Sequence, residues 1–332
     1  MLLYKYSFVT AMSFDPSPIA RELAPVPILA GGARSDFDLS VEELNSCLAL
    51  AAEVKRVPQA YSSALSGRIA SLLFEKPSLR TRITFEVAAR QLGGDSILYT
   101  GPIGGREPVK DVARNLERWT SMIVARTFAQ TTVDELAKWA RIPVINALSD
   151  LYHPCQALAD MLTLKEHWGG WAGHTLAFVG DGNNVAHSLM LDSARLGVNF
   201  TCITPPGYEP SPEILASAQA FAESTGASIR TTTSVEDGLA EAEAVYTDVW
   251  ASMGQEHEAA ERARLFASYQ VNADLMRLAS PGALFMHCLP AHREEETTDE
   301  VMESPTSVVF DQAENRLHAQ KALMMMLAAS GD

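Results

Sequence analysis

The 332-residue sequence has few cysteines, few positive charges and no long hydrophobic run. Its four cysteines (Cys47, Cys155, Cys202 and Cys288) are widely separated and include no C-x-x-C pair. This spacing excludes the usual zinc motifs, argues against a disulfide framework and favours a reducing compartment. No apolar stretch reaches the roughly 20 residues that a membrane-spanning helix needs. We therefore expect a cytoplasmic protein with no membrane contact.

The shortage of positive charge limits the partners of the chain. Lys and Arg total 26 against 41 Asp and Glu, and the formal net charge is −15. A protein this acidic repels nucleic acids and anionic membranes, so we expect no nucleic-acid partner. Any site for an anion must then sit in a local basic cluster, and Lys76, Arg80, Arg82 and Arg90 form one.

The length and the pattern of the chain predict an α/β fold with two domains. Residues 1–34 contain Pro16, Pro18, Pro25 and Pro27, and we expect them to form a loosely ordered extension. After them, apolar runs typical of strands alternate with helix-like segments in two units of similar size. We expect each unit to hold a central parallel sheet flanked by helices. Interdomain helices would join the units, with a ligand cleft between them.

The first chemically informative segment follows the apolar run Ile69–Phe74, which reads as a buried strand. Ser78 is placed as the N-cap of the next helix, whose first turn carries Arg80, Thr81 and Arg82. Cations are unfavourable there, because a helix N-terminus already carries partial positive charge. A bound anion would remove the conflict. A plain cap followed by solvated arginines is the alternative.

The segment His153-Pro154-Cys155-Gln156 ends a loop and begins a helix that crosses to the second unit. Proline suits an early helical position, so His153 and Gln156 would face whatever lies at that helix N-terminus. The helix dipole disfavours a cationic histidine, which fits a neutral hydrogen-bond donor. Taken alone, the segment fits a helix cap with a satisfied histidine equally well.

The second unit opens with the Gly-Asp-Gly-Asn-Asn segment at 180–184. This segment lacks the third glycine of a dinucleotide fingerprint, and no acidic residue ends the next strand, which argues against a nicotinamide cofactor. Asp248 follows another strand and is placed for a substrate ammonium, although an Asx-turn explains it too. The segment Ser252-Met253-Gly254 that follows is expected to be a mobile loop.

Two further residues lie near the end of the chain. Cys288, in the His-Cys-Leu-Pro segment at 287–290, is either a nucleophile or a buried small residue. The segment 311–316 is expected to open the last helix, which would put Arg316 in a first turn, like Arg80. Arg316 is thus a second candidate anion ligand.

These five segments, in this order, resemble the aspartate/ornithine carbamoyltransferase family across nearly all of residues 40–327. The segments at 78–82 and 153–156 resemble its carbamoyl-phosphate signatures. The segments at 180–184, 248–254 and 287–290 resemble those of the ornithine-specific members, because the aspartate-specific members carry Pro where Cys288 stands.

The resemblance implies transfer of a carbamoyl group from carbamoyl phosphate to L-ornithine in arginine biosynthesis, without a cofactor or a metal. Another acceptor, such as acetylornithine or putrescine, and a non-catalytic carbamoyl-phosphate-binding protein remain alternatives. It also implies a homotrimer, or a multiple of one, with shared active sites. A carbamoyl-phosphate domain would span 35–152, completed by the helix 313–330, and an ornithine domain would span 153–312.

The resemblance also assigns residues by position. Arg126, His153, Gln156 and Cys288 would be catalytic. Carbamoyl phosphate would be bound by Ser78, Leu79, Arg80, Thr81, Arg126, His153, Pro154, Cys155, Gln156, Cys288, Leu289 and Arg316, and ornithine by Asn184, Asp248, Ser252 and Met253. One position departs from the family, since Pro102 stands where a Gln usually reaches a neighbouring subunit's carbamoyl phosphate. Arg106 or Lys110 could compensate.

Overall fold

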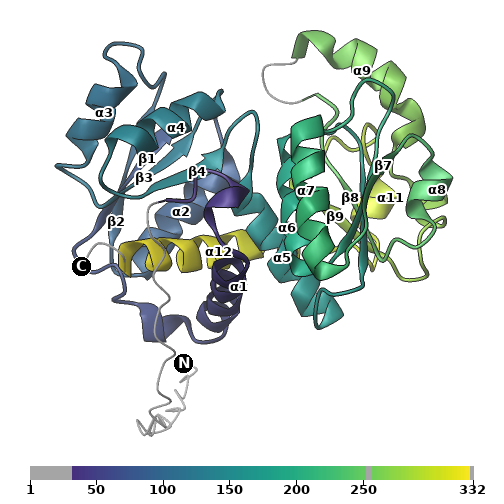
Figure 1. The fold of residues 1–332 in the computed structure, drawn as a ribbon, viewed down its shortest axis with the longest axis horizontal. Helices are drawn as coiled ribbons and strands as arrows, with labels where there is room; N and C mark the ends of the chain where they lie inside the picture. The colour runs from purple at the N-terminus through teal and green to yellow at the C-terminus, as the bar shows by residue number, and fades with distance from the viewer. Residues whose placement is uncertain (1–31, 252–255, 330–332) are drawn as a thin grey trace, which may run out of the picture.

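The computed structural model describes residues 32–251 and 256–329. The expected N-terminal extension therefore lies almost wholly outside the described residues, as do Ser252 and Met253. Within the described part, two parallel sheets lie side by side, each flanked by helices (Figure 1). The predicted α/β fold with two parallel-sheet units is confirmed.

The first sheet has four parallel strands in the order β2-β1-β3-β4. Its inner strand β1 (Ile69–Phe74) is apolar except for Ser71, and five of its six residues are buried, as expected for a parallel strand covered on both faces. The other elements of this unit are β2 (Asp95–Thr100), β3 (Met122–Arg126), β4 (Val144–Leu148), α2 (Leu79–Gln91), α3 (Val109–Leu116) and α4 (Gln130–Trp139).

The second sheet has five parallel strands in the order β7-β6-β5-β8-β9. Its order reverses at β5, so a crevice opens at the carboxyl ends of β5 and β8. Its elements are β5 (Thr175–Val179), β6 (Asn199–Ile203), β7 (Ile229–Thr232), β8 (Ala244–Thr247), β9 (Leu284–His287), α6 (Asn184–Leu196), α7 (Pro212–Thr225), α8 (Val235–Leu239), α9 (Ala259–Phe266), α10 (Ala273–Met276) and α11 (Asp299–Met302).

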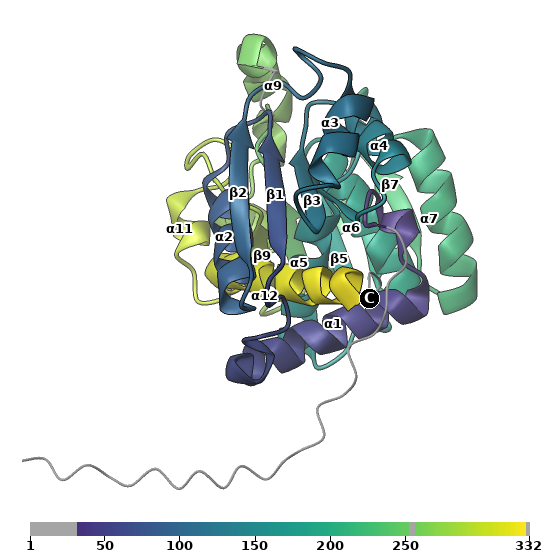
Figure 2. The same cartoon turned by 90° about the vertical axis from the view of Figure 1, so that its left-hand side faces the viewer.

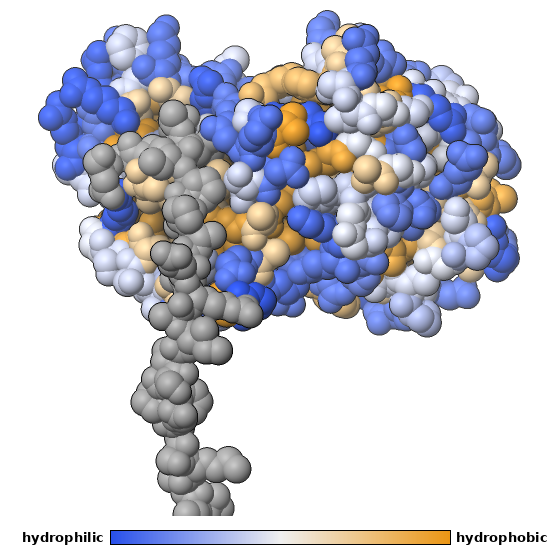
Figure 3. All heavy atoms as spheres, turned by 60° about the horizontal axis from the view of Figure 1, so that its bottom comes forward, coloured by the Kyte–Doolittle hydropathy of each residue, from blue (hydrophilic) through white to orange (hydrophobic). Residues whose placement is uncertain are grey.

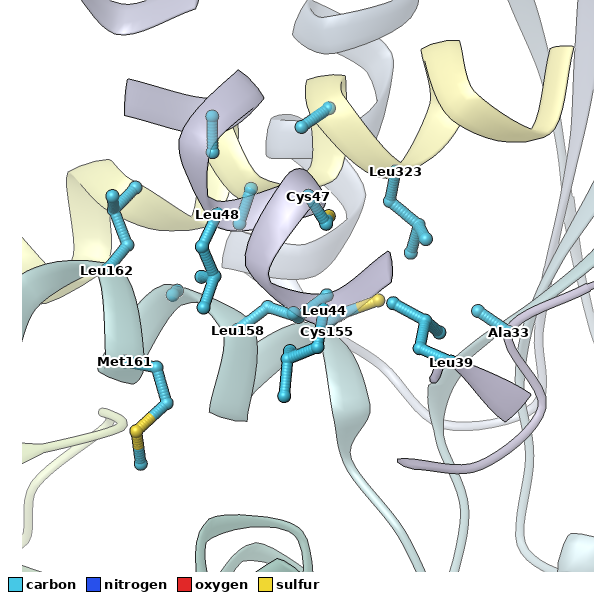
Figure 4. Packing of buried hydrophobic residues seen from close by; sticks show 14 of the residues in the cluster. Ala33, Leu39, Leu44, Cys47, Leu48, Cys155, Leu158, Met161, Leu162 and Leu323 are labelled. Carbon is cyan, nitrogen blue, oxygen red and sulfur yellow. The ribbon is translucent and has the colours of Figure 1, made fainter. Parts of the chain in front are cut away.

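Three helices hold the first unit together and connect it to the second: α1 (Val41–Arg56), α5 (Pro154–Trp168) and α12 (Val309–Ala328). The last helix leaves β9 in the second sheet and returns to pack against α1, α2 and α5 (Figure 2). Figure 4 shows Leu44 and Cys47 of α1 beside Cys155 and Leu158 of α5, with Leu323 of α12 nearby. These contacts place both ends of the described chain on one hydrophobic core.

The predicted helix start at Ser78 was confirmed, because Ser78 caps α2 by accepting a hydrogen bond from the Thr81 amide. The helix α1 begins with a reciprocal capping box between Ser40 and Glu43. The start of the last helix was wrong, because α12 begins at Val309. Buried contacts of Val309 and Gln312 extend the helix toward its N-terminus. Arg316 therefore lies beyond the first turn, and the dipole argument does not apply to it.

The helix α3 is short, with eight residues. The helix α3 ends at Leu116, and the chain then turns tightly because the amide of Trp119 donates to the carbonyl of Leu116.

Among the described residues, no helix is both long and apolar enough to cross a membrane. Figure 3 shows one face of the molecule on which hydrophilic residues predominate around smaller apolar patches.

Candidate active site

A cleft of about 1000 Å³ lies between the two sheets, at the carboxyl ends of their strands. It is lined by residues that directly follow β1, β3, β5, β8 and β9, as expected for ligand sites in open α/β sheets. One wall, which we call the cationic half, comprises Ser78, Arg80, Thr81, Arg126 and Arg316. The opposite wall, which we call the carboxylate half, comprises Asn183, Asn184, Asp248 and Cys288.

The cationic half brings together arginines from three separate elements. Arg80 lies in the first turn of α2, Arg126 ends β3 and Arg316 comes from α12. The guanidinium of Arg316 donates to Thr81 Oγ1 at 2.8 Å and to Gln156 Oε1 at 2.6 Å. Arg80 and Arg126 form no side-chain hydrogen bond or ion pair with any described residue. The buried Nε atoms of Arg126 and Arg316 have no partner within the part of the chain that the structure describes.

Within the described residues, none of these three guanidinium groups forms an ion pair with a carboxylate, and Asp248 and Asp160 act on Arg80 and Arg316 only at longer range. Burial, followed by repulsion from Arg316 and Arg80, lowers the pKa of Arg126 to about 10. Burial also lowers the pKa values of Arg80 and Arg316. Buried like charges without a counter-ion are unfavourable, and an anion with several acceptor oxygens would reverse that cost. The geometry is that of a site for a phosphate-like dianion.

His153 stands at the N-terminus of α5 and faces the same cleft. Burial and the charges of Arg316 and Arg126 hold its pKa well below the usual value, so the ring is neutral at neutral pH. Its buried Nδ1 has no partner among the described residues. The backbone N–H of His153 donates to Ser188 Oγ at 2.9 Å, and that hydroxyl donates to Asp36 Oδ2 at 2.6 Å. This connection fixes the position of the histidine from the rear.

Gln156 is held by a second buried network. Its Nε2 donates to Asp160 Oδ1 at 2.8 Å, and Gln312 Nε2 donates to the same oxygen at 2.7 Å. The hydroxyl of Tyr246 donates to Asp160 Oδ2 at 3.1 Å. Burial raises the pKa of Asp160 to about 7. This carboxyl therefore joins α5, α12 and β8 directly behind the cationic half.

The carboxylate half is satisfied by its own hydrogen bonds. Asp248 follows β8 and accepts from Asn183 Nδ2 at 2.9 Å and from the thiol of Cys288 at 2.9 Å. Asn184 Nδ2 donates to the carbonyl of Ser149 at 2.6 Å, across from the first unit. Burial and the charge of Asp248 raise the pKa of the Cys288 thiol well above its ordinary value. A thiol held in its protonated form is a poor nucleophile.

Two residues near this wall, Leu289 and Gly182, have an unusual backbone conformation or an unusually close backbone contact. Leu289 adopts a φ of 59°, which a leucine rarely does, and such strain is typical of ligand sites. Gly182 packs so closely on Pro210 that a Cβ at that position would overlap the neighbouring backbone. This close packing accounts for a glycine that otherwise resembles part of a dinucleotide fingerprint.

Most of the predicted site residues line one cleft, but two do not. Pro154 and Cys155 lie in the buried first turn of α5, where the Cys155 thiol donates to the carbonyl of Asn146. Tyr208, Arg262 and His292 also line the cleft, although no pattern in the sequence pointed to them. Arg262 forms an ion pair with Asp181 at 2.7 Å, and no motif in the sequence marks that contact.

The site can be compared with those of known proteins. The carbamoyl-P binding domain of aspartate/ornithine carbamoyltransferase matches residues 34–166, and the Asp/Orn binding domain matches residues 172–327. The ornithine carbamoyltransferase of Acidothermus cellulolyticus is 47% identical over 302 residues, which cover 90% of this chain and 97% of that protein.

Solved structures give the same result. The ornithine carbamoyltransferase from Pyrococcus furiosus superposes with a TM-score of 0.89 at 44% identity, covering 92% of this chain and 100% of that one. A mutant N-acetyl-L-ornithine transcarbamylase complexed with PALAO gives a TM-score of 0.81 at 30% identity, covering 89% of this chain and 99% of that one. With both domains matched in order and the two-walled cleft between their sheets, the chain belongs to the aspartate/ornithine carbamoyltransferase family.

Proposed function

We propose that this chain transfers the carbamoyl group of carbamoyl phosphate to the δ-amine of L-ornithine, giving L-citrulline and phosphate. One observation carries the proposal. Three arginines that form no ion pair with a described carboxylate (Arg80, Arg126 and Arg316) face Asp248 and the protonated thiol of Cys288 across a single cleft. This arrangement suits a reaction between a phosphate-bearing donor and an amino-acid acceptor. The relatives named as ornithine carbamoyltransferases support this choice of reaction.

The cationic half would bind the donor. The phosphate would sit at the N-terminus of α2, bound by Ser78, Arg80, Thr81 and Arg316, with the exposed Leu79 contributing its backbone amide. Arg126 and His153 would contact the carbamoyl oxygen, where negative charge develops as the amine attacks. The neutral imidazole of His153 suits a hydrogen-bond donor in that position. Gln156 would contact the carbamoyl amide while Arg316 and Asp160 hold it in place.

The carboxylate half would bind the acceptor. Asp248 would pair with the α-ammonium of ornithine, and Asn184 would contact its carboxylate. Cys288 and the backbone of Leu289 would orient the δ-amine toward the carbonyl carbon. The neutral amine forms the new C–N bond as the C–O bond to phosphate breaks, and the leaving phosphate accepts the amine proton. Ser252 and Met253, the other proposed acceptor ligands, lie outside the described residues.

The domain boundaries and the assembly are also part of the proposal. Residues 35–152 with the helix 313–330 would bind carbamoyl phosphate, and residues 153–312 would bind ornithine. We expect a homotrimer, or a multiple of one, with shared active sites. Exposed apolar side chains support an interface at the edge strand β2 and at α2, namely Leu79, Ile83, Ile97 and Tyr99. Pro102, in the loop after β2, replaces a side-chain donor there and would weaken the affinity for carbamoyl phosphate.

The assay is citrulline formation by the purified chain with carbamoyl phosphate and L-ornithine. Production of citrulline is the expected result, and arginine biosynthesis in the cytoplasm would be its setting. Absence of any carbamoylated product with ornithine, N-acetylornithine and putrescine would refute the proposal. Calorimetry that shows tight carbamoyl-phosphate binding without turnover would instead support a non-catalytic binding protein.

N-acetylornithine is the second candidate acceptor, because the structure of an N-acetyl-L-ornithine transcarbamylase resembles this chain. Acetylation removes the charge of the α-amine, so Asp248 would then have no cationic partner. The carboxylate would keep its hydrogen bonds from Asn183 and Cys288 but would gain no ion pair from this acceptor. The kcat/KM for L-ornithine should therefore exceed that for N-acetylornithine, and the opposite ranking would assign the acceptor differently.

A further inference from the structure

A second group of potential ligands lies on the segment that follows β9, at the rim of the cleft. We call His292, Glu295 and Glu296 the rim cluster. One ligand atom from each residue lies within 4.8 Å of the others. The Nδ1 atom of His292 is 3.5 Å from Glu295 Oε2 and 3.9 Å from Glu296 Oε2.

Glu296 is unusual within this group because its side chain is completely buried. Its Oε1 atom accepts from His287 Nε2 at 3.1 Å and from the backbone N–H of His292 at 2.5 Å. Its Oε2 atom is buried and has no hydrogen-bond partner among the described residues. A buried carboxylate oxygen without a donor is unfavourable, and this oxygen is the one nearest the His292 ring.

The spacing of these atoms suits a metal ion. Nitrogen and oxygen ligands lie at about 2.0–2.2 Å from zinc, so two ligands of one ion are roughly 3–3.5 Å apart. The two distances from His292 Nδ1 are at or slightly above that range, and contraction around an ion would need only small side-chain movements. His292 and Glu295 are about half exposed, so solvent water could fill the remaining positions.

We propose that His292, Glu295 and Glu296 bind one divalent transition-metal ion of the zinc type. One imidazole and two carboxylates favour such an ion over Mg²⁺ or Ca²⁺, which prefer oxygen ligands alone. Glu296 would bind through Oε2 while its Oε1 stays fixed by His287, the arrangement in which a buried neighbour orients a metal ligand. The inference does not rest on the proposed transfer reaction, and no step of that reaction passes through the ion.

Asp248, His287 and Cys288 form a competing cluster, but their ligand atoms are already engaged. His287 Nδ1 accepts from the amide of Leu289 at 2.8 Å, and its Nε2 faces Glu296. The thiol of Cys288 donates to Asp248. An ion there would have to break these contacts, whereas an ion at the rim cluster would satisfy an unpartnered oxygen.

Zinc binding can be measured by titrating ZnCl₂ into the full chain in a calorimeter, in a buffer free of phosphate and chelators. One ion per chain is expected. His292→Ala and Glu295→Gln should each weaken binding by at least about tenfold, because each removes a direct ligand. His174→Ala is the matched control, since His174 is another partly exposed histidine that faces one carboxylate, Glu243. It should leave the affinity unchanged.

Cobalt distinguishes the two clusters. Co²⁺ at the rim cluster should give visible ligand-field bands without a thiolate charge-transfer band, and the spectrum should persist in Cys288→Ser. A thiolate band that disappears in Cys288→Ser would place the ion at Asp248 and Cys288 and overturn the proposal. Absence of zinc binding, or equal affinity in wild type, His292→Ala and Glu295→Gln, would overturn it too. Thermal unfolding of each variant without metal identifies any misfolded protein, and Glu295→Gln, on an exposed side chain, provides the decisive comparison if His292→Ala does not fold.

Discussion

The cationic half of the cleft places three guanidinium groups together, none of them ion-paired with a carboxylate among the described residues, whereas the carboxylate half satisfies its own polar groups. Arg80 and Arg126 have no side-chain hydrogen bond to a described residue, and burial and mutual repulsion lower the pKa of Arg126 to about 10. Across the cleft, Asp248 accepts from both Asn183 and Cys288. The charges of the cationic half therefore have no ion-pair partner in the described chain before a ligand binds, whereas the polar groups of the carboxylate half already have hydrogen-bond partners.

This difference has consequences for binding. An anion entering the cationic half relieves repulsion and forms hydrogen bonds that the protein itself does not make. An amino acid entering the carboxylate half must replace hydrogen bonds that already exist, so its net gain is smaller. We therefore expect the donor to bind tightly to a preformed site. The acceptor should depend more on rearrangement, including that of the Asp248 side chain.

The largest expected effect comes from Arg126→Ala, which removes a buried charge from the cationic half. Loss of one donor to a developing oxyanion typically lowers kcat by about 10²–10³. Steady-state kinetics with saturating carbamoyl phosphate and L-ornithine would measure the loss. Arg118→Ala is a matched control, because Arg118 is an exposed arginine of the same unit. An unchanged kcat in Arg126→Ala would remove Arg126 from the proposed site.

Asp248→Asn should separate the two walls. The amide can still accept from Asn183, but it cannot neutralise an ammonium. The kcat/KM for ornithine should therefore fall by a factor that corresponds to about 1.5–3 kcal/mol of lost transition-state stabilisation. Affinity for carbamoyl phosphate, measured by calorimetry, should stay close to that of wild type.

Arg80→Ala is the reciprocal change, with a similar loss of about 1.5–3 kcal/mol in carbamoyl-phosphate binding. Equal losses for both ligands in both variants would show that the halves do not act separately.

Cys288→Ser should have a smaller effect. Serine can donate to Asp248 as the thiol does. The expected change in kcat/KM therefore corresponds to about 0.5–1.5 kcal/mol of activation free energy, the net value of one hydrogen bond. Burial and the charge of Asp248 keep the thiol protonated, which disfavours a covalent role. Complete loss of citrulline formation in a folded Cys288→Ser variant would instead favour covalent chemistry.

The last prediction concerns stability and not catalysis, through the buried carboxyl behind the cationic half. Folding raises the pKa of Asp160 to about 7, so between about pH 4 and 7 the folded chain binds a proton that the unfolded chain releases. The free energy of unfolding should therefore fall as pH rises through this range, with this one group contributing at most about 1.4 kcal/mol per pH unit.

Asp160→Asn removes this titration and should make urea-unfolding free energies less dependent on pH. Burial also raises the pKa values of Asp36 and Asp192, so part of the slope should remain. An identical pH dependence in wild type and Asp160→Asn would contradict the assignment.

Local patterns predicted the residues whose role depends on the nearby backbone. Ser78 caps α2 and Arg80 follows it into the cleft, as the sequence indicated. Arg316 was predicted to face the cleft for the wrong reason, because α12 starts earlier than its apolar pattern suggested and packs back on α2. Cys155, within a recognisable motif, points into the core instead. Periodicity identifies a helix but does not show which of its faces meets a neighbour.

The sequence by itself determined the two parallel-sheet units and the motifs at the ends of their strands, because apolar runs, caps and glycines act over a few residues. Only the tertiary structure decided which of these ends meet. It brought Arg316 to Thr81 across 235 positions, Ser188 to Asp36 across 152, and Glu296 to His287 behind the rim cluster. These contacts follow from the packing of α12, α6 and the segment after β9, and burial and charge repulsion arise only once such residues are close.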